Sequence, residues 1–165
     1  MYKNKNMVDI IIPNYNKGKY LDSAIKSVIN QSFKNWNLYI IDDHSVDSSK
    51  KILKKYKGNK KIKIHYMKKN MGPGYCRNIG ILKSKSELIA FLDSDDLWKK
   101  NKLKIQLKFM EKNKCLFSYT DYESFILKSQ KKLFLGRTKV SDSFNFKQFT
   151  RNSSINTSTM IINRK

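Results

Sequence analysis

The sequence is poor in cysteine, in acidic residues and in long apolar runs, and each shortage excludes a class of protein. Its two cysteines, Cys76 and Cys115, and its two histidines stand in no spacing typical of a disulfide framework, a redox pair or a zinc site. No apolar run approaches the roughly 20 residues that a bilayer-spanning helix needs. The apolar run behind the basic amino terminus is too short for a signal-peptide core. We therefore expect a cytoplasmic protein with reduced thiols.

Acidic residues are outnumbered by 35 basic to 13 acidic, which gives a formal net charge of +22. Such a charge suggests a nucleic-acid partner. However, only four of the basic residues are arginines, and the lysines are spread along the whole chain. We therefore expect a solvated lysine-rich surface and no nucleic-acid partner. The charge also allows peripheral contact with the anionic inner face of the membrane. A basic nucleic-acid-binding module remains the alternative if the protein is not an enzyme.

What the sequence does contain is an alternation of short apolar strands and helical patterns, in a chain long enough for one domain with a real core. Strands are predicted over residues 8–12, 36–41, 62–66, 88–92, 115–119 and 159–162, with the first expected to stop at Pro13. Helices are predicted over 21–29, 47–56, 74–82 and from beyond Trp98 to about 113. Residues 126–140 suggest a hairpin or an irregular excursion, and Phe146 and Phe149 a helical turn. The alternation predicts an α/β fold with a mostly parallel, doubly wound sheet and helices on both faces.

Five of the 13 acids fall in two clusters, each directly after a predicted strand. One is Asp42-Asp43, and the other is formed by Asp93, Asp95 and Asp96. In an open α/β sheet, ligands bind in the crevice at the carboxyl ends of the strands. If the segment after residue 92 is extended, the side chains of Asp93 and Asp95 point to the same side and can face one crevice.

Two carboxylates are too few for a hard divalent cation, which takes about six oxygen ligands. The oxygens of a bound diphosphate would supply most of the remainder, so the second cluster makes sense as half of a metal site that a phosphorylated substrate completes. The alternative is structural: acids before a helix commonly cap its first turn. Capping stays open for both clusters at this point.

Four blocks of sequence, in order, resemble the family-2 inverting glycosyltransferases, which have a Rossmann-like GT-A fold. They are IIIPNYNKGKYL, QSFKNWNLYIIDDHSVDSS, NMGPGYCRNIGI and LIAFLDSDDLW. The tail NTSTMIINRK resembles the strand that follows in that family. The resemblance implies a nucleotide-sugar-binding α/β core over residues 1–120, followed over residues 121–165 by an incomplete start of the acceptor-side region and a returning strand.

The resemblance also implies roles for single residues. The loop of Pro13, Asn14, Tyr15 and Asn16 would hold the nucleotide base, and Asp43, or less favourably Asp42, would accept a hydrogen bond from the uracil imide. The segment from Gly74 to Gly80 would bring a helix amino terminus and Arg77 toward the nucleotide or the donor sugar. A solvated guanidinium is the plainer alternative for Arg77.

By the same resemblance, Asp93 and Ser94 would contact the nucleotide sugar, and Asp93 and Asp95 would bind a Mn or Mg ion. Asp95 would be the principal ligand, whereas Asp96 would support the site or cap the next helix. The metal would neutralise charge on the leaving diphosphate.

The activity so implied is the transfer of a sugar, with inversion, from a nucleotide-diphosphate sugar, UDP-linked by expectation, to a saccharide or lipid-linked acceptor. The general base of the family lies downstream of the strand that Thr159 to Ile162 resembles, and thus beyond Lys165. We therefore expect the chain to carry the nucleotide-sugar half of the enzyme and to have weak transferase activity or none by itself. A catalytically incomplete nucleotide-sugar-binding fragment is the close alternative.

Overall fold

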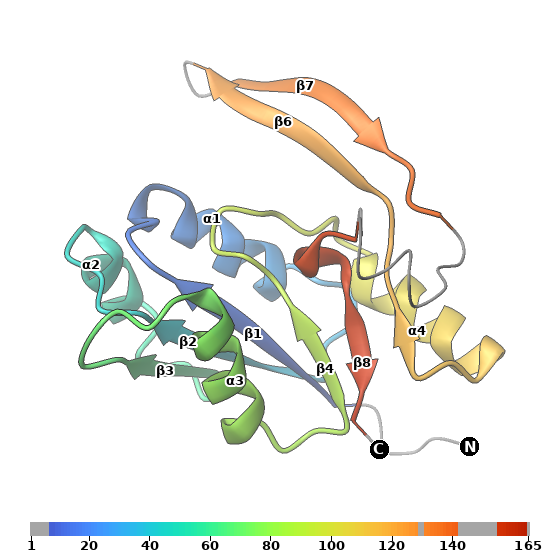
Figure 1. The fold of residues 1–165 in the computed structure, drawn as a ribbon, viewed down its shortest axis with the longest axis horizontal. Helices are drawn as coiled ribbons and strands as arrows, with labels where there is room; N and C mark the ends of the chain where they lie inside the picture. Colours follow the sequence, from blue (N-terminus) through green and yellow to red (C-terminus); the bar gives the residue numbers. More distant parts are fainter. Residues whose placement is uncertain (1–6, 129–130, 142–154, 165) are drawn as a thin grey trace.

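A six-stranded sheet forms the centre of the protein in the computed structural model, which describes residues 7–128, 131–141 and 155–164 (Figure 1). The strand order is β3-β2-β1-β4-β8-β5. The first four strands in sequence are parallel: β1 (Val8–Asn14), β2 (Trp36–Asp42), β3 (Ile62–Tyr66) and β4 (Leu88–Phe91). β8 (Ile161–Asn163) is antiparallel to β4 and to β5 (Phe117–Ser118). The order reverses between β1 and β4, which makes this the switch point of the sheet.

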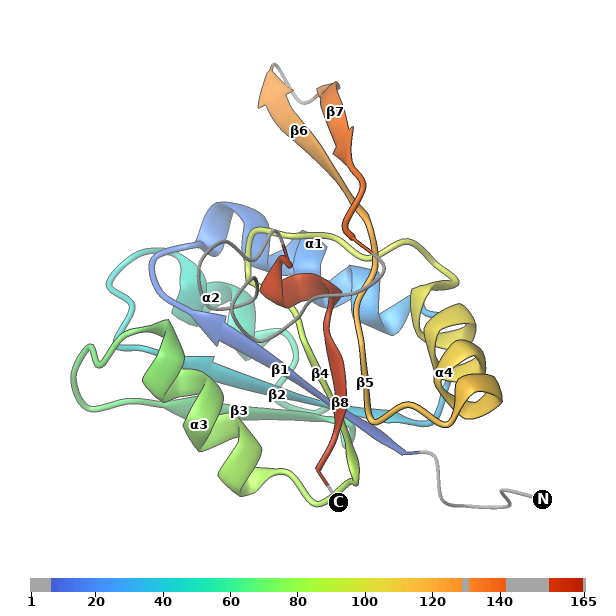
Figure 2. The ribbon, with the colours of Figure 1, turned by 45° about the vertical axis from the view of Figure 1, so that its right-hand side comes forward.

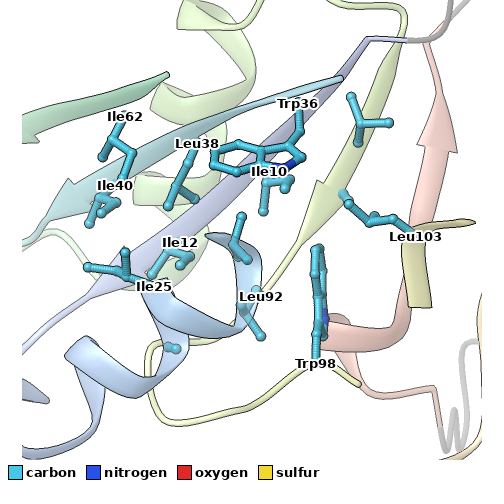
Figure 3. Close-up of a cluster of buried hydrophobic side chains, with 14 of the residues drawn as sticks. Ile10, Ile12, Ile25, Trp36, Leu38, Ile40, Ile62, Leu92, Trp98 and Leu103 are labelled. Atoms are coloured by element: carbon cyan, nitrogen blue, oxygen red, sulfur yellow. The ribbon is translucent and has the colours of Figure 1, made fainter. Parts of the chain in front are cut away.

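Helices cover both faces of this sheet. On one face, residues of α1 (Gly18–Ile29), α2 (Ser49–Lys54) and α4 (Lys102–Asn113) join a cluster with alternate residues of β1 and β2. Figure 3 shows part of this cluster, including Ile10 and Ile12 of β1, Ile25 of α1 and Leu103 of α4. On the other face, Ile81 of α3 (Pro73–Lys83) packs against the neighbouring set, which includes Ile11. Figure 2 shows α3 on the opposite side of the sheet from α1 and α2. The predicted mostly parallel, doubly wound α/β fold is therefore confirmed.

The expected end of the first strand at Pro13 is wrong. β1 runs through Pro13 to Asn14, and both residues pair with β2. β4 pairs with β1 only as far as Ile11, and the amide of Leu92 donates to the carbonyl of Ile11. Pro13 lies two residues farther along β1, so its backbone nitrogen points to the same edge of the strand but lies beyond the end of β4. Its missing N–H therefore removes no ladder hydrogen bond, which is the situation in which a strand accepts proline.

Other predicted boundaries shift by a few residues. α2 is shorter than the predicted 47–56, and β5 has two residues where five were predicted. The last strand begins at Ile161, after a short 3-10 turn, Thr157–Thr159. The helical turn predicted at Phe146 and Phe149 lies outside the described residues.

β6 (Tyr122–Lys128) and β7 (Lys131–Thr138) pair antiparallel as a hairpin, the first of the two alternatives that the sequence left open. Figures 1 and 2 both show it extending away from the sheet and its helices. Ile126, Leu133, Phe134 and Leu135 are exposed on it. In the part of the chain that the structure describes, no helix is long and apolar enough to cross a bilayer.

The contact between α3 and β1 depends on the absence of a side chain at Gly80. An added Cβ there would lie 2.4 Å from Cγ2 of Ile11, which is fully buried. Glycine at this position therefore lets the helix lie directly on the central strand. The same helix contains Gly74, where an added Cβ would meet no atom within 4 Å.

Ser158 ties the returning segment near the carboxyl terminus to the loop after β4. Its hydroxyl donates to Oδ2 of Asp96 at 2.5 Å and accepts a hydrogen bond from the amide of Asp93 at 2.9 Å. Its carbonyl accepts a hydrogen bond from Nε1 of Trp98 at 2.7 Å. Three residues that follow β4 are thus fixed by one residue that precedes β8.

We expect Gly80→Ala to lower the free energy of unfolding by about 1–3 kcal/mol, because the new methyl overpacks the contact with Ile11. Gly74→Ala is the matched control in the same helix and should cause no loss. Urea denaturation of both variants measures the difference. Equal stability of the two variants would show that α3 does not pack on β1 as closely as the structure has it.

Ser158→Ala should lower the free energy of unfolding by about 1–3 kcal/mol, because it leaves the amide of Asp93 and the carboxyl of Asp96 without this partner. Thr157→Ala in the same 3-10 turn is the control, since the Thr157 hydroxyl makes no hydrogen bond to any described residue. Thermal unfolding followed by circular dichroism compares them. A Tm loss in the control as large as that of Ser158→Ala would contradict the assignment.

Candidate functional site

The first acid cluster lies at the end of β2, and its two members face different parts of the molecule. Asp42 is fully buried, and its Oδ2 accepts a hydrogen bond from Nδ2 of Asn14 at 2.8 Å. Its Oδ1 accepts from the amide of Ser45 at 3.0 Å, and Nδ2 of Asn14 also donates to Oγ of Ser45 at 3.1 Å. Asn14 itself is only 1% exposed. The carboxylate of Asp42 thus holds the loops after β1 and β2 together from inside.

Asp43 instead holds the loop that leads into α3. Its Oδ1 accepts a hydrogen bond from the amide of Met71 and its Oδ2 from the amide of Gly72, both at 2.8 Å. Each carboxylate oxygen has two acceptor positions, so this leaves acceptor capacity on Asp43 for one more donor. Burial, together with the charge of Asp43, raises the pKa of Cys76 behind it to about 12. Cys76 is therefore a neutral core thiol.

Neither acid of this cluster caps α2. Asp47 does so, because its Oδ1 accepts from the amide of Ser49 at 2.9 Å while its Oδ2 accepts from the amide of Gly18 at 2.8 Å. One carboxylate thus serves the starts of both α1 and α2. The capping alternative for Asp42 and Asp43 is excluded by these contacts.

The second acid cluster follows β4 in a turn rather than in an extended segment. The amide of Asp96 donates to the carbonyl of Asp93 at 3.0 Å, which closes a four-residue turn. The extended backbone that was predicted for Asp93 to Asp95 is therefore wrong. Asp95 still meets a cation from another loop: its hydrogen bond and its charge raise the pKa of Lys17, and the charge of Asp93 adds to this.

Each acid of this turn has its own compensating partner. Nη2 of Arg77, from α3, lies 2.6 Å from Oδ1 of Asp93. Nζ of Lys17, from the loop before α1, lies 2.7 Å from Oδ2 of Asp95. The carboxyl of Asp96 is bound by Ser158, as described above. Burial raises the pKa of Asp96, and the charges of Asp93 and Asp95 raise it further against the lowering effect of that hydrogen bond.

Asp96 and Asp95 do not cap the following helix. α4 begins at Lys102, and its first turn is capped by Gln31, whose Oε1 accepts a hydrogen bond from the amide of Leu103 at 3.1 Å. The exposed fractions of the side chains separate the acids by accessibility: 31% for Asp93 and 39% for Asp95, whereas Asp96 is engaged inward by Ser158. Asp93 and Asp95 are thus the members of the cluster that a ligand can reach.

The loop after β1 and the start of α3 border the same region. Tyr15 is 48% exposed, whereas Oδ1 of Asn16 accepts a hydrogen bond from the amide of Val46 at 2.9 Å. Gly74 in the first turn of α3 has open space where a side chain would be. Nε of Arg77 is buried and has no hydrogen-bond partner among the described residues. Guanidinium groups and free amides at a helix start are suited to anionic ligands.

A divalent cation fits these residues as half of a site. Among the described residues, no group of three or more His, Cys, Asp or Glu side chains could hold a metal ion by itself. Asp93 and Asp95 offer hard carboxylate oxygens that solvent reaches, and the ammonium of Lys17 already lies at them as a monovalent cation. A set of two carboxylates needs further oxygen ligands from a substrate or from water.

Sequence reasoning missed Lys17, Ser45 and Ser158. Lys17 is one of many lysines, and nothing in its local pattern separates it from the others. Ser158 lies more than 60 residues from Asp96, so only the antiparallel return of β8 beside β4 brings the two together. Ser45 could have been found from the polar run that follows Asp42-Asp43.

Comparisons with known proteins identify the family. The model of "Glycosyl transferase family 2" matches residues 9–165. The putative teichuronic acid biosynthesis glycosyltransferase TuaG of Bacillus subtilis is 40% identical over 119 residues, which are 72% of this chain and 47% of that protein. The UDP-Glc:alpha-D-GlcNAc-diphosphoundecaprenol beta-1,3-glucosyltransferase WfgD of Escherichia coli is 31% identical over 158 residues, which are 96% of this chain and 60% of that protein.

The fold agrees with solved structures as well. Staphylococcus aureus TarS in complex with UDP-GlcNAc superposes with a TM-score of 0.64 at 29% identity, over 68% of this chain and 33% of that one. The first four curated relatives are matched over only 17% to 47% of their own length. The matched range, residues 9–165, includes both acid clusters, Arg77 and the returning strand. The chain belongs to glycosyl transferase family 2.

Proposed function

We propose that this chain binds a UDP-sugar in the crevice at the switch point of its sheet, as the donor half of an inverting glycosyltransferase. The observation that supports this most directly is the turn after β4, where two accessible carboxylates face cations from two other elements. Asp93 is paired with Arg77 and Asp95 with Lys17, and all four side chains are partly exposed. Groups of both signs, at the point where α/β sheets bind ligands, suit a diphosphate and its counter-ion.

The loops around the crevice suggest how the nucleoside is held. The exposed ring of Tyr15 offers a face on which a base can stack, and the backbone of Pro13 to Asn16 borders it. Asp43 is only 2% exposed and accepts one backbone amide on each oxygen, so each oxygen keeps one acceptor position for the uracil imide. Asp42 is 0% exposed and acts by fixing the loops. Arg77, whose Nε has no partner among the described residues, and Gly74 would contact the phosphates or the donor sugar.

The proposal includes a Mn or Mg ion held by Asp93 and Asp95. When bound, such an ion would supply positive charge for the diphosphate that leaves the sugar. Lys17 must release Asp95 to make this possible. Ser158 keeps the turn in place through Asp96 and the amide of Asp93, so the chain itself orients the two accessible acids.

The acceptor side is proposed from the relatives and from the hairpin. WfgD is named for a diphosphoundecaprenol-linked acceptor, so we propose a saccharide or lipid-linked acceptor here. The hairpin of β6 and β7, with four exposed apolar side chains, would begin the acceptor-side region within residues 121–165. A cytoplasmic location with peripheral contact to an anionic membrane belongs to the same proposal and is supported by the net charge of +22.

Binding of the nucleotide sugar without transfer is the second candidate. A specific observation favours it: the described acids of the hairpin region are already engaged. Asp121 is paired with Arg137 at 3.1 Å and Glu123 with Lys99 at 2.7 Å. A general base must reach an acceptor hydroxyl within about 3 Å in the reacting complex, and each of these acids lies against a basic side chain in this arrangement.

Calorimetry with UDP, in the presence and absence of Mn, tests the site. We expect binding that depends on the metal and that Asp95→Ala abolishes, because one of two protein ligands is lost. Glu87→Ala, which removes an acid at the opposite end of β4, is the control and should bind as the wild type does. UDP binding of equal strength in chelator, or in Asp95→Ala with Mn, would count against the assignment.

Lys17→Met should strengthen Mn binding in the absence of nucleotide by up to about fivefold, because an ion pair of this exposure is worth about 1 kcal/mol at most. Electron paramagnetic resonance of free Mn gives the affinity directly. Lys19→Met removes a neighbouring charge that has no ion pair among the described residues and serves as the control. Weaker Mn binding in Lys17→Met, or the same change in both variants, would show that Lys17 does not compete for Asp95.

A further inference from the structure

A pocket of about 280 Å³ lies on the α3 face of the sheet, away from the crevice described above. Its lining includes Tyr39 of β2, Lys63 and His65 of β3, and Lys83 and Lys85 from the end of α3 and the loop after it. Lys83 and Lys85 precede β4, whereas the turn of Asp93 to Asp96 (the acid turn) follows the carboxyl end of that strand. The lysines of this pocket are therefore not among the residues proposed for the donor site.

The fold explains why cations converge there. Tyr39 pairs with Lys63 across β2 and β3, and both residues point to the face on which α3 lies. α3 packs on β1 and β2, so the edge strand β3 stays uncovered on that face. Side chains from β3 and from the end of α3 then border the open space between them.

No carboxylate lines this pocket. None of Lys63, Lys83 and Lys85 forms an ion pair with any residue that the structure describes. Lys63 is oriented by Tyr39: its Nζ donates to the Tyr39 hydroxyl at 3.0 Å and lies 4.7 Å from the ring centroid. The pocket is therefore a concentration of positive charge with ordered walls and no internal counter-ion.

Asp9, one of the acids close to this end of the sheet, is engaged by other groups. Asp9 is fully buried, and its Oδ2 accepts hydrogen bonds from the amides of Lys85 at 2.7 Å and Ser86 at 2.9 Å. Its Oδ1 accepts from Nδ2 of Asn37 at 2.9 Å. Asp9 thus fixes the backbone at Lys85 and forms no ion pair with the ammonium groups of the pocket.

The imidazole of His65 reports the local potential. Burial lowers the pKa of His65, and the charge of Lys83 lowers it further. Like charges gathered in a concave site disfavour one another, and a bound anion relieves this. His65 is also one of only two histidines in the chain, so its signals are easily resolved from those of His44.

We propose that this pocket binds a phosphate group, held by the ammonium groups of Lys63, Lys83 and Lys85 with Tyr39 as a polar wall. Lysines act on phosphate as point charges, and three of them, from β3, α3 and the loop after it, surround a compact anion better than they match an extended strand of nucleic acid. The volume is slightly below that of typical small-molecule sites, so it suits a phosphate with a small attached group. Free phosphate and the headgroup of an anionic lipid share this chemistry.

Proton NMR of the two imidazoles tests the proposal at constant ionic strength. Titration with inorganic phosphate should shift the Hε1 signal of His65 saturably and raise its pKa by about 1 unit, as a new neighbouring anion does. The signal of His44, which is exposed, should stay unchanged. Parallel small shifts of both signals, without saturation, would overturn the proposal.

A charge-matched pair of variants separates a site from general attraction. The triple variant Lys63→Gln, Lys83→Gln, Lys85→Gln should lose the saturable response. The control Lys50→Gln, Lys54→Gln, Lys57→Gln removes the same charge from exposed positions in and after α2 and should keep it. Equal loss in both variants would also overturn the proposal.

Vesicle flotation then identifies the source of the phosphate group. If the headgroup is bound, vesicles of phosphatidylglycerol should retain the wild type and the control variant but not the triple variant, and vesicles of phosphatidylcholine should retain none. If both triple variants float with phosphatidylglycerol alike while His65 responds to inorganic phosphate, a free phosphate or phosphate ester is the ligand. Asp95→Ala should respond as the wild type does in both assays, so failure of the donor site leaves this result unaffected.

Discussion

The ion pair between Lys17 and Asp95 spans the switch point of the sheet, where the candidate site lies. Lys17 follows β1 and Asp95 follows β4, the two strands between which the strand order reverses. Three carboxylates within four residues repel one another unless each is compensated. Compensation comes from three separate elements: Arg77 of α3, Lys17 before α1, and Ser158 before β8. The acid turn therefore contacts α3, the loop before α1 and the segment before β8.

This arrangement explains why the sequence predicted the position of the site better than its geometry. Strand ends follow from local pattern, and acids placed directly after strands must gather at one edge of a parallel sheet. The partners of those acids do not follow from local pattern. Lys17 is one lysine among many, and Ser158 meets Asp96 only because β8 returns antiparallel to β4. Long-range pairing of this kind leaves no periodic signal in the sequence.

The two errors about backbone have the same origin. Pro13 was expected to end β1 because proline cannot donate to a ladder. The ladder with β4, toward which its backbone nitrogen points, has already ended at Ile11. Asp93 and Asp95 were expected in an extended segment, yet the chain turns as soon as β4 ends. Both outcomes depend on where β4 stops relative to β1. That length is set by packing across the sheet and not by the residues of either segment alone.

In the described part of the chain, the basic residues are paired with acids in one region of the sheet and unpaired in another. At the carboxyl ends of the strands, Arg77 and Lys17 meet accessible acids, so cations there are balanced and can be exchanged. On the α3 face, Lys83 and Lys85 join Lys63 in a pocket that no carboxylate lines, and nearby Asp9 binds the amides of Lys85 and Ser86. The first region thus presents paired charges and the pocket unpaired ones. An anion that carries its own counter-ion suits the first region, and an anion without one suits the pocket.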